Sequence, residues 1–344
     1  MSDEFQTKCL PVTDKSLEWA AELLKGGQVV AFPTETVYGL GANALNEEAV
    51  GKIFAAKMRP ADNPLIVHLY DPEQMPELCE ISEATRRLME AFCPGPITML
   101  CPKKPIIPDI VTANLGSVGI RFPSHEGARA LLKACNLPIA APSANLSTRP
   151  SPTRALHVLE DMQGRIPLIL DGGDCQVGVE STVVDMTGEV PVVLRPGAVT
   201  PEMIAAVCGV CEVADSVMRP LREGESAPSP GMRHRHYAPR GKMTIVCGNA
   251  EAVCRRICDL YDQSGAQKPC ILSLTDHIPA YAGRLTLDLG RDEGALAHNI
   301  FALLRRADEL GIDRIFAEGI ADRGVGLAVM NRMARAAAFD IEQV

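Results

Sequence analysis

The sequence predicts an α/β protein with two domains. Its 344 residues exceed what one hydrophobic core usually organises, and its 47% hydrophobic content is enough for two cores. From residue 241 onward, short apolar runs alternate with longer amphipathic runs, a pattern typical of parallel strands joined by helices. We place the domains at residues 1–210 and 241–344. Residues 211–240, rich in proline, glycine and arginine, are interpreted as a linker that closes as a lid.

The elements of the first domain follow from apolar runs and capping residues. An amphipathic pattern over residues 15–25 predicts a helix, and the run 28–32 before Pro33 predicts a buried strand. Asn46 predicts the cap of a helix that ends near Lys57 and is stopped by Pro60. The other expected strands are 65–70, 97–101, 138–141, 168–170, 179–185 and 192–197, and the other expected helices are 82–92 and 126–134.

The second domain shows regular alternation, which favours a small, largely parallel Rossmann-like sheet. Its expected strands are 243–247, 270–274, 285–289 and 314–318, and its expected helices are 250–261, 295–310 and 327–338. The first of these strands is followed by Cys247-Gly-Asn rather than by Gly-x-Gly-x-x-Gly. Nucleotide binding in this domain is therefore weakly supported.

Composition excludes several classes of protein. Nucleic-acid-binding domains usually carry a net positive charge, whereas this chain has a formal net charge of −9. We therefore expect no stable nucleic-acid binding. No 18-residue apolar run and no secretion signal is found, which predicts a cytoplasmic protein that does not cross a membrane. The twelve cysteines are dilute and are interpreted as buried thiols, and Cys208-x-x-Cys211 has no second pair at zinc spacing.

The candidate site is organised by residues 33–68. Residues 33–41 are small, hydroxylated and rich in glycine, and are interpreted as a loop at a strand end, where ligands commonly bind. Lys57 and Arg59 lie two residues apart at an exposed helix end, so they can converge on one anionic group. Considered singly, each cation is also explained by the helix dipole.

Other polar residues follow other strands. Ser143 and Asn145 supply neutral hydrogen-bonding groups after a strand, among small residues that permit close approach of a ligand. Arg121 lies in an apolar segment and needs a partner, either an internal carboxylate or a bound one. His68 on its strand is, taken alone, more often structural than a ligand contact, and Ser151 is also explained as a helix cap.

The chemistry available to these residues is limited. The chain contains no Gly-x-x-x-x-Gly-Lys-[Ser/Thr] phosphate loop, no apparent Ser-His-Asp triad and no activated cysteine. A site rich in cations and hydrogen-bond donors, without an evident nucleophile, suits catalysis by positioning and charge stabilisation.

Together these motifs resemble those of the threonylcarbamoyl-AMP synthases, the family called YrdC, Sua5 or TsaC. The family signature is Lys-x-Arg followed far downstream by Ser-x-Asn, here Lys57, Arg59, Ser143 and Asn145. Residues 229–239 resemble the linker of the longer, two-domain Sua5 form. The resemblance implies a YrdC-like twisted mixed sheet with flanking helices, plus a smaller Rossmann-like α/β C-terminal domain.

The resemblance also implies an activity, that of an L-threonylcarbamoyladenylate synthase, a nucleotidyltransferase. L-threonine and bicarbonate form a carbamate, which attacks the α-phosphate of ATP and releases pyrophosphate. The product, L-threonylcarbamoyl-AMP, serves a tRNA threonylcarbamoyl-transferase complex that makes N6-threonylcarbamoyladenosine (t6A) at position 37 of tRNA. Mg²⁺ is expected to accompany ATP, held mainly by phosphates, because the sequence shows no dedicated carboxylate cage.

Carried over residue by residue, the resemblance implies three overlapping sets. The catalytic set is Lys57, Arg59, Ser143 and Asn145. The set for L-threonine is Thr36, His68, Arg121, the Ala141 backbone and Ser181. The set for ATP is Arg59, Asn63, Ser117, Ser143, Ser151, Arg195, and Tyr237 or His236.

Two other functions compete with this one. The carbamoyl-adenylate domain of the hydrogenase-maturation protein HypF would bring an acylphosphatase domain and paired Cys-x-x-Cys motifs, and both are missing from this chain. A double-stranded-RNA-binding module belongs to a different class and is disfavoured by the acidic charge balance. Salt-dependent RNA binding would distinguish the module from an enzyme.

Overall fold

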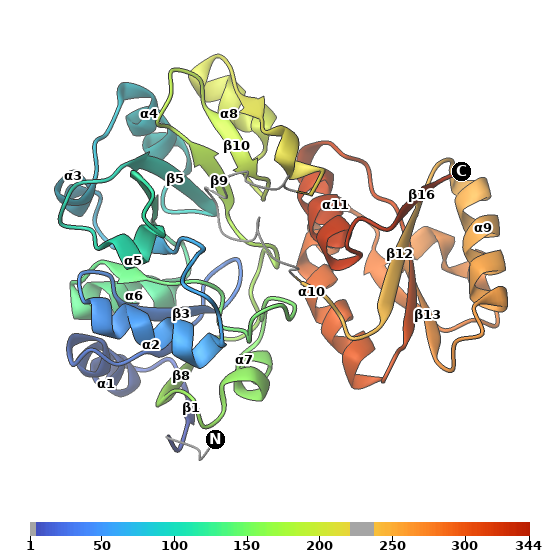
Figure 1. The fold of residues 1–344 in the computed structure, drawn as a ribbon, viewed down its shortest axis with the longest axis horizontal. Helices are drawn as coiled ribbons and strands as arrows, with labels where there is room; N and C mark the ends of the chain where they lie inside the picture. The colour runs from blue at the N-terminus through green and yellow to red at the C-terminus, as the bar shows by residue number, and fades with distance from the viewer. Residues whose placement is uncertain (1–4, 221–236) are drawn as a thin grey trace.

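The computed structural model describes residues 5–220 and 237–344, which form two sheets with their own helices (Figure 1). The larger sheet and its helices make up one lobe, and the smaller sheet makes up the other. Helices α10 (Glu293–Glu309) and α11 (Gly324–Ala336) belong to the smaller lobe and lie on its side facing the larger one (Figure 1).

The larger sheet has eleven strands among the described residues, in the order β1-β8-β2-β3-β7-β4-β6-β5-β9-β10-β11. Parallel and antiparallel pairs both occur, so the expected mixed sheet is confirmed. Its strands are β1 Lys8–Pro11, β2 Val30–Phe32, β3 Gly39–Asn43, β4 Ile66–His68, β5 Ile97–Pro102, β6 Ser117–Arg121, β7 Ile139–Ala140, β8 Leu168–Asp171, β9 Thr182–Asp185, β10 Val192–Arg195 and β11 Glu212–Val213.

Helices cover both faces of this sheet because successive strand residues point to opposite sides. In β2, Val30 and Phe32 join the core under α1 and α6, whereas Ala31 joins the core under α2. Asn46 caps α2 as expected, since its side chain accepts a hydrogen bond from the Ala49 N–H at 3.1 Å. The helices are α1 Asp14–Lys25, α2 Glu47–Lys57, α3 Met75–Leu78, α4 Glu83–Phe92, α5 Asp109–Thr112, α6 Glu126–Cys135, α7 Ala155–Met162 and α8 Pro201–Cys208, with 3₁₀ turns η1 Pro72–Gln74 and η2 Asp215–Val217.

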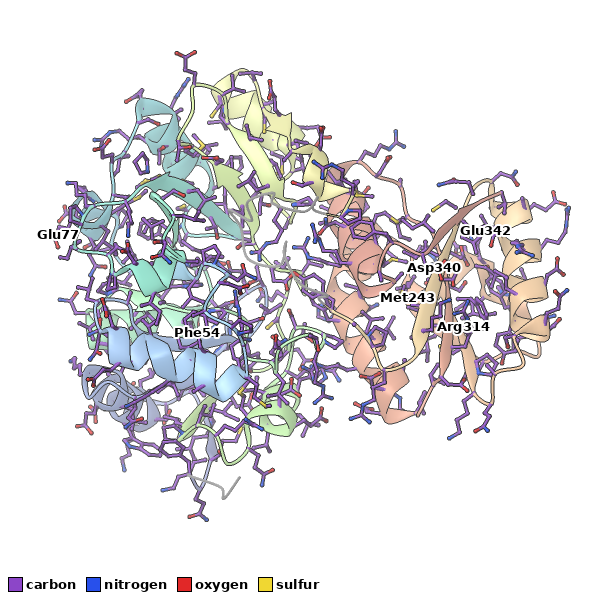
Figure 2. The ribbon with its side chains drawn as sticks, in the orientation of Figure 1. Phe54, Glu77, Met243, Arg314, Asp340 and Glu342 are labelled. Atoms are coloured by element: carbon purple, nitrogen blue, oxygen red, sulfur yellow. The ribbon has the colours of Figure 1, made fainter. Side chains whose placement is uncertain are left out.

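The smaller sheet is parallel throughout, in the order β14-β13-β15-β12-β16, and confirms the Rossmann-like expectation. Helix α9 (Ala250–Gln263) packs on one face and α10 and α11 on the other. Figure 2 labels Arg314 and Asp340 in this lobe, and both side chains hydrogen-bond Thr244, at 2.8 and 2.9 Å. The strands are β12 Lys242–Cys247, β13 Pro269–Leu274, β14 Thr286–Gly290, β15 Arg314–Glu318 and β16 Ile341–Gln343, with a 3₁₀ segment η3 Thr275–Tyr281.

One segment interpreted as loop is partly strand. Gly39–Asn43 forms β3, which pairs antiparallel with β2. The glycines that suggested a loop are needed for packing, because a Cβ at Gly41 would lie 2.8 Å from both the Phe32 ring and the Ile139 side chain. Only residues 33–38 remain as the loop between the two strands.

The predicted linker is described only in part. Its beginning contains β11, which pairs parallel with β10, and then η2. Residues 221–236 lie outside the described residues, and so does most of the segment expected to form a lid. Among the helices of the described residues, none is long and apolar enough to cross a membrane.

Candidate active site

A pocket lies where several strands of the larger sheet end. The loop after β2 and the ends of β4, β6 and β10 all reach it, together with residues that follow α2 and β7. Three guanidinium groups line it against one carboxylate, which favours an anionic ligand. Its lining residues are Thr34, Val37, Gly39, Arg59, Ile66, His68, Arg121, Ala141, Pro142, Ser143, Glu180, Arg195 and Tyr237.

Arg121, the last residue of β6, is held in place by the loop after β2. Its Nη2 donates to Glu35 Oε1 at 2.8 Å, to Thr36 Oγ1 at 2.8 Å and to Thr34 Oγ1 at 3.4 Å. Both partners of the Arg121–Glu35 ion pair are buried. The sequence left open whether Arg121 pairs with an internal carboxylate or with a bound one. The structure shows that Glu35 is an internal partner. Arg121 Nε is also buried and has no partner among the described residues, so one donor remains for a ligand.

His68 lies beside Arg121 at the end of β4 and is fully covered. Its Nδ1 lies 3.1 Å from the Ile66 carbonyl oxygen, and its ring meets Phe32 edge to face. Burial, reinforced by the Arg121 charge, lowers the pKa of His68 to about 3. The imidazole is therefore neutral at pH 7. The same Ile66 carbonyl accepts the Ala141 N–H at 2.8 Å, whereas the Ala141 carbonyl accepts no backbone hydrogen bond among the described residues.

Arg195 is braced by the segment that precedes β9. Its Nε and Nη2 donate to the Ser181 carbonyl at 3.1 and 3.0 Å, and Nη2 also donates to Ser181 Oγ at 3.2 Å. Ser181 Oγ further bonds Thr98 Oγ1 at 2.8 Å, so Ser181 lies beneath the wall rather than on it. Burial lowers the pKa of Arg195 to about 10 despite the nearby Glu180, and the guanidinium stays charged at pH 7.

Glu180 is a pocket residue that the sequence reasoning missed. Its carboxylate accepts Ser151 Oγ at 2.6 Å and Arg332 Nε at 2.8 Å. Burial alone would raise its pKa, but Arg332 and Arg195 outweigh that effect and lower the pKa to about 2. Arg332 comes from α11 of the second lobe, 152 residues away, so no local pattern could reveal the pair.

Ser151 is not a helix cap, and that interpretation was wrong. Helix α7 begins at Ala155, and its N-cap residue, Arg154, makes no side-chain capping bond. Ser151 is buried instead, and its hydroxyl donates a hydrogen bond to the Glu180 carboxylate. Thr34 is a second missed lining residue, although it lies inside the segment selected from the sequence.

Arg59 also lines the pocket, and the neighbouring Asn63, which is not a lining residue, holds it in place. Arg59 Nη2 donates to the Asn63 carbonyl at 3.0 Å. Its guanidinium lies 5.9 Å from the centre of the ring of Phe54, a residue of α2 that Figure 2 labels. Arg59 Nε and both side-chain amide atoms of Asn63 are buried without a partner among the described residues. Burial lowers the pKa of Arg59 to about 10, so it too stays charged at neutral pH.

Lys57 is buried, and the expectation of an exposed helix-end cation was wrong. Its Nζ donates to the carbonyls of Ser143 and Asn145, the latter at 2.7 Å. The chain after β7 covers the end of α2, with the Ser147 N–H bonded to the Lys57 carbonyl at 2.9 Å. Burial lowers the pKa of Lys57 well below its usual value. Lys57 therefore lies behind the wall and supports the segment that carries Ser143.

The segment after β7 is fixed by its own side chains. Ser143 Oγ donates to Asn145 Oδ1 at 2.5 Å, and Asn145 Nδ2 donates to the carbonyls of Leu146 and Arg149 at 2.8 and 2.9 Å. Ser143 lines the pocket, whereas Asn145 holds the turn behind it. The four signature residues thus meet in one place, although Arg59 and Ser143 alone among them line the pocket.

Tyr237 closes the pocket from the second lobe. It is buried, its ring centre lies 5.0 Å from that of Phe301, and the Arg332 guanidinium lies 5.8 Å from its ring. Its alternative, His236, falls outside the described residues.

Ser117 is not brought to this pocket. It begins the β6 strand that Arg121 ends, about 13 Å away at the usual rise per residue.

The described residues of the pocket do not form a cage for a metal ion. Glu180 is the single carboxylate among the described lining residues, and Arg332 already pairs with it. A donor set of guanidinium, hydroxyl and amide groups suits phosphate oxygens rather than a divalent cation.

Comparisons with known proteins show which family the chain resembles. A family model named for Sua5, YciO and YrdC, described as "Telomere recombination", matches residues 22–197. A second, described as "Threonylcarbamoyl-AMP synthase, C-terminal domain", matches residues 199–338. The chain is similar to the threonylcarbamoyl-AMP synthases of Pyrococcus abyssi, at 43% identity over 98% of this chain and 100% of that protein, and of Bacillus subtilis, at 44% identity over 95% and 94%.

The fold agrees over the same length. A crystal structure of P. abyssi Sua5 complexed with L-threonine superposes with a TM-score of 0.90 at 42% identity, covering 99% of both chains. Both family models, these relatives and this structure span the two lobes together. The chain therefore belongs to the Sua5 family of threonylcarbamoyl-AMP synthases.

Proposed function

We propose that the pocket is where the chain performs its family's reaction, the synthesis of L-threonylcarbamoyl-AMP from L-threonine, bicarbonate and ATP with release of pyrophosphate. The observation that carries this proposal is the convergence of Arg59, Arg121 and Arg195 on one pocket. Planar guanidinium groups suit both the carboxylate of an amino acid and the oxygens of a triphosphate.

L-threonine binds on the Arg121 side. The unpaired Arg121 Nε meets its carboxylate, and the Ala141 carbonyl accepts from its amino group. Neutral His68 adds a hydrogen-bonding group without adding charge. Thr36 and Ser181 act from the layer beneath, since each hydroxyl already bonds an arginine of the pocket.

ATP binds on the Arg59 side. The unpaired donors of Arg59 and Asn63 meet phosphate oxygens, and Arg195 carries the charge of the reacting phosphate. Ser143 borders both substrates, while Ser151 orients Glu180 from behind. Tyr237 packs against the nucleotide, with His236 as its alternative. Ser117 stays in the proposed set as a contact for a part of ATP that extends beyond the pocket along β6.

The reaction needs no protein nucleophile. Bicarbonate and the threonine amine give a carbamate and release water. A carbamate oxygen then forms the new bond to the α-phosphorus as the bond to pyrophosphate breaks. Arg59 and Arg195 stabilise the negative charge that moves onto the leaving group, and the fixed backbone around Lys57, Ser143 and Asn145 keeps the reactants aligned.

The product leaves for a tRNA threonylcarbamoyl-transferase complex that makes t6A at position 37, in the cytoplasm. Mg²⁺ arrives with ATP. The chain itself forms no stable complex with nucleic acid, in keeping with a net charge of −9.

The decisive experiment is pyrophosphate release from Mg–ATP with the full chain. Release is expected only when L-threonine and bicarbonate are both present, with L-threonylcarbamoyl-AMP formed in equal amount. Release that depends on ATP alone, or that proceeds at the same rate with carbamoyl phosphate in place of threonine and bicarbonate, would reject the proposal.

A further inference from the structure

Three side chains with metal-binding atoms meet in the smaller lobe, far along the chain from the pocket. The thiol of Cys254, the imidazole of His277 and the carboxylate of Glu318 have ligand atoms that all lie within 4.8 Å of one another. We propose that these three residues form a binding site for a divalent cation of the zinc class.

The fold positions the three residues at the carboxyl edge of the parallel sheet. Glu318 ends β15, and His277 lies in η3, directly after β13. Phe316 packs in the core under α9, and Glu318, two residues further along the same strand, points to the same face. Cys254 lies on α9, so it faces Glu318 across this edge.

This edge is also where such sheets usually bind ligands. Strand β15 lies between β13 and β12, and the helix after β12 packs on the opposite face from the helix after β15. Loops that leave neighbouring strands toward opposite faces open a crevice at their carboxyl ends, the common ligand site of open α/β sheets. The side chain of Glu318 is 3% exposed and that of His277 is 30% exposed, so the crevice admits an ion from solvent.

The three donor groups are of types that zinc binds, and a neighbouring hydroxyl orients one of them. Thiolate, imidazole and carboxylate are its three common protein ligands, and three of them leave one position for water. His277 Nδ1 lies 2.5 Å from Glu318 Oε2, a hydrogen bond that the cation would replace. Ser273 Oγ donates to Glu318 Oε1 at 2.7 Å. The bond from Ser273 is the outer support that orients a ligating carboxylate.

Metal binding to the full chain tests the proposal directly. After removal of metal with a chelator, Zn²⁺ should bind at one ion per chain in equilibrium dialysis and raise the melting temperature in proportion to occupancy. Co²⁺ should give a sulfur-to-metal charge-transfer band, because one ligand is a thiolate. Cys254→Ser should abolish the band and weaken Zn²⁺ binding at least tenfold, and Ser273→Ala should weaken binding about 10–100-fold.

Cys258→Ser is the matched control. Cys258 lies one turn further along α9, its Sγ lies 3.8 Å from the Ala280 carbonyl oxygen, and it is not one of the three clustered residues. This variant should keep the band and the affinity. Should Glu318→Gln fail to fold, His277→Ala provides the same test at a more exposed ligand. Equal Zn²⁺ binding by Cys254→Ser and Cys258→Ser, or a chelated chain without a Co²⁺ thiolate band, would overturn the proposal.

Discussion

The two sides of the pocket hold their arginines in different ways. On one side, Arg121 is tied to three side chains of the loop after β2 and forms a buried ion pair with Glu35. On the other side, Arg59 bonds only backbone carbonyls, and the neighbouring Asn63 leaves both amide atoms unpaired among the described residues.

This difference separates a structural from a functional contribution. Arg121 is fixed before any ligand arrives, so it costs little reorganisation on binding, but the fold depends on it. The Arg59 side carries unpaired buried donors, each of which costs about 1–3 kcal/mol until a partner is supplied. We therefore expect changes at Arg121 to affect stability and activity together, and changes at Arg59 to affect activity alone.

The largest effect should come from Arg121→Met. Removing one partner of a buried ion pair leaves Glu35 charged and unpaired, which typically costs about 3–5 kcal/mol. Urea unfolding should show this loss, and the KM for threonine should rise. The double variant Arg121→Met with Glu35→Gln removes both charges and should recover much of the stability without recovering activity. Recovery of both would contradict a direct role for Arg121.

Arg59→Ala should lower turnover strongly while leaving the free energy of unfolding almost unchanged. Loss of one preorganised charge at the reacting phosphate typically lowers turnover by about 10²–10³-fold. The free energy of unfolding should change little, because the variant loses two bonds to backbone carbonyls but also removes the buried, unpaired Arg59 Nε. Steady-state pyrophosphate release and urea unfolding measure the two quantities on one preparation. Arg129→Ala is the matched control, since Arg129 also lies over an aromatic ring, at 5.0 Å from the centre of Tyr70, but does not line the pocket. A stable, fully active Arg59→Ala variant would contradict the functional role given to Arg59 in the comparison with Arg121.

Lys57→Met should destabilise the fold less than Arg121→Met and lower kcat less than Arg59→Ala. The variant keeps the length of the side chain but leaves two buried carbonyls without their donor, a loss of about 2 kcal/mol. Activity should fall indirectly, through a looser Ser143 segment, and more through KM than through kcat. Lys52→Met is the control on the same helix, because Lys52 is exposed and donates to one carbonyl, that of Gly27. A kcat loss for Lys57→Met as large as that of Arg59→Ala would place Lys57 on the reacting groups instead.

The sequence predicted local features well because their causes are local. The Asn46 cap, the end of α2 and the Rossmann-like alternation depend on neighbouring residues, and the structure confirms them. The mixed sheet of the first lobe came from the family resemblance rather than from the pattern. Strand β3 was missed because its glycines serve packing against Phe32, and a glycine's role in close packing cannot be distinguished from its role in a turn by sequence alone.

The site was predicted less completely because its partners are distant in sequence. The Lys57 side chain is covered by residues 86 and 88 positions away, so a helix-end cation appeared exposed when it is buried. Glu180 pairs with Arg332 of the other lobe, 152 residues away. The residue types in the pocket were therefore predictable, but which of them line it and which support it from behind depended on long-range contacts.

Substrate selectivity tests the Arg121 side with smaller changes. Serine lacks one methyl group of threonine, and a missing methyl in an apolar niche is worth roughly 1–3 kcal/mol, or 10–200-fold in kcat/KM. Valine keeps the shape but lacks the hydroxyl, so it should be accepted even less well, because polar groups that face the hydroxyl lose their partner. Equal turnover of threonine and valine would contradict a threonine site on the Arg121 side, because no polar group of the pocket would then depend on the substrate hydroxyl.

The smallest expected effect is a pH dependence that arises at His68. Its pKa of about 3 in the folded chain lies below the ordinary value of about 6.5, so between these values the unfolded chain binds a proton that the folded chain does not. Stability therefore rises with pH across this window and falls on acidification. From pH 7 to pH 5.5 the loss from His68 should be roughly 1 kcal/mol.

Urea unfolding of His68→Asn at both pH values measures this contribution. The variant should lose about half of the wild-type pH dependence, because the pKa of buried His157 is also lowered to about 3, mainly by burial, and should supply the rest. His125→Asn is the control, since His125 is partly exposed and asparagine can replace it as the N-cap acceptor of α6. An unchanged pH dependence in His68→Asn would mean that His68 is charged at pH 5.5 in the folded chain. The Arg121 side of the pocket would then carry two adjacent positive charges rather than one.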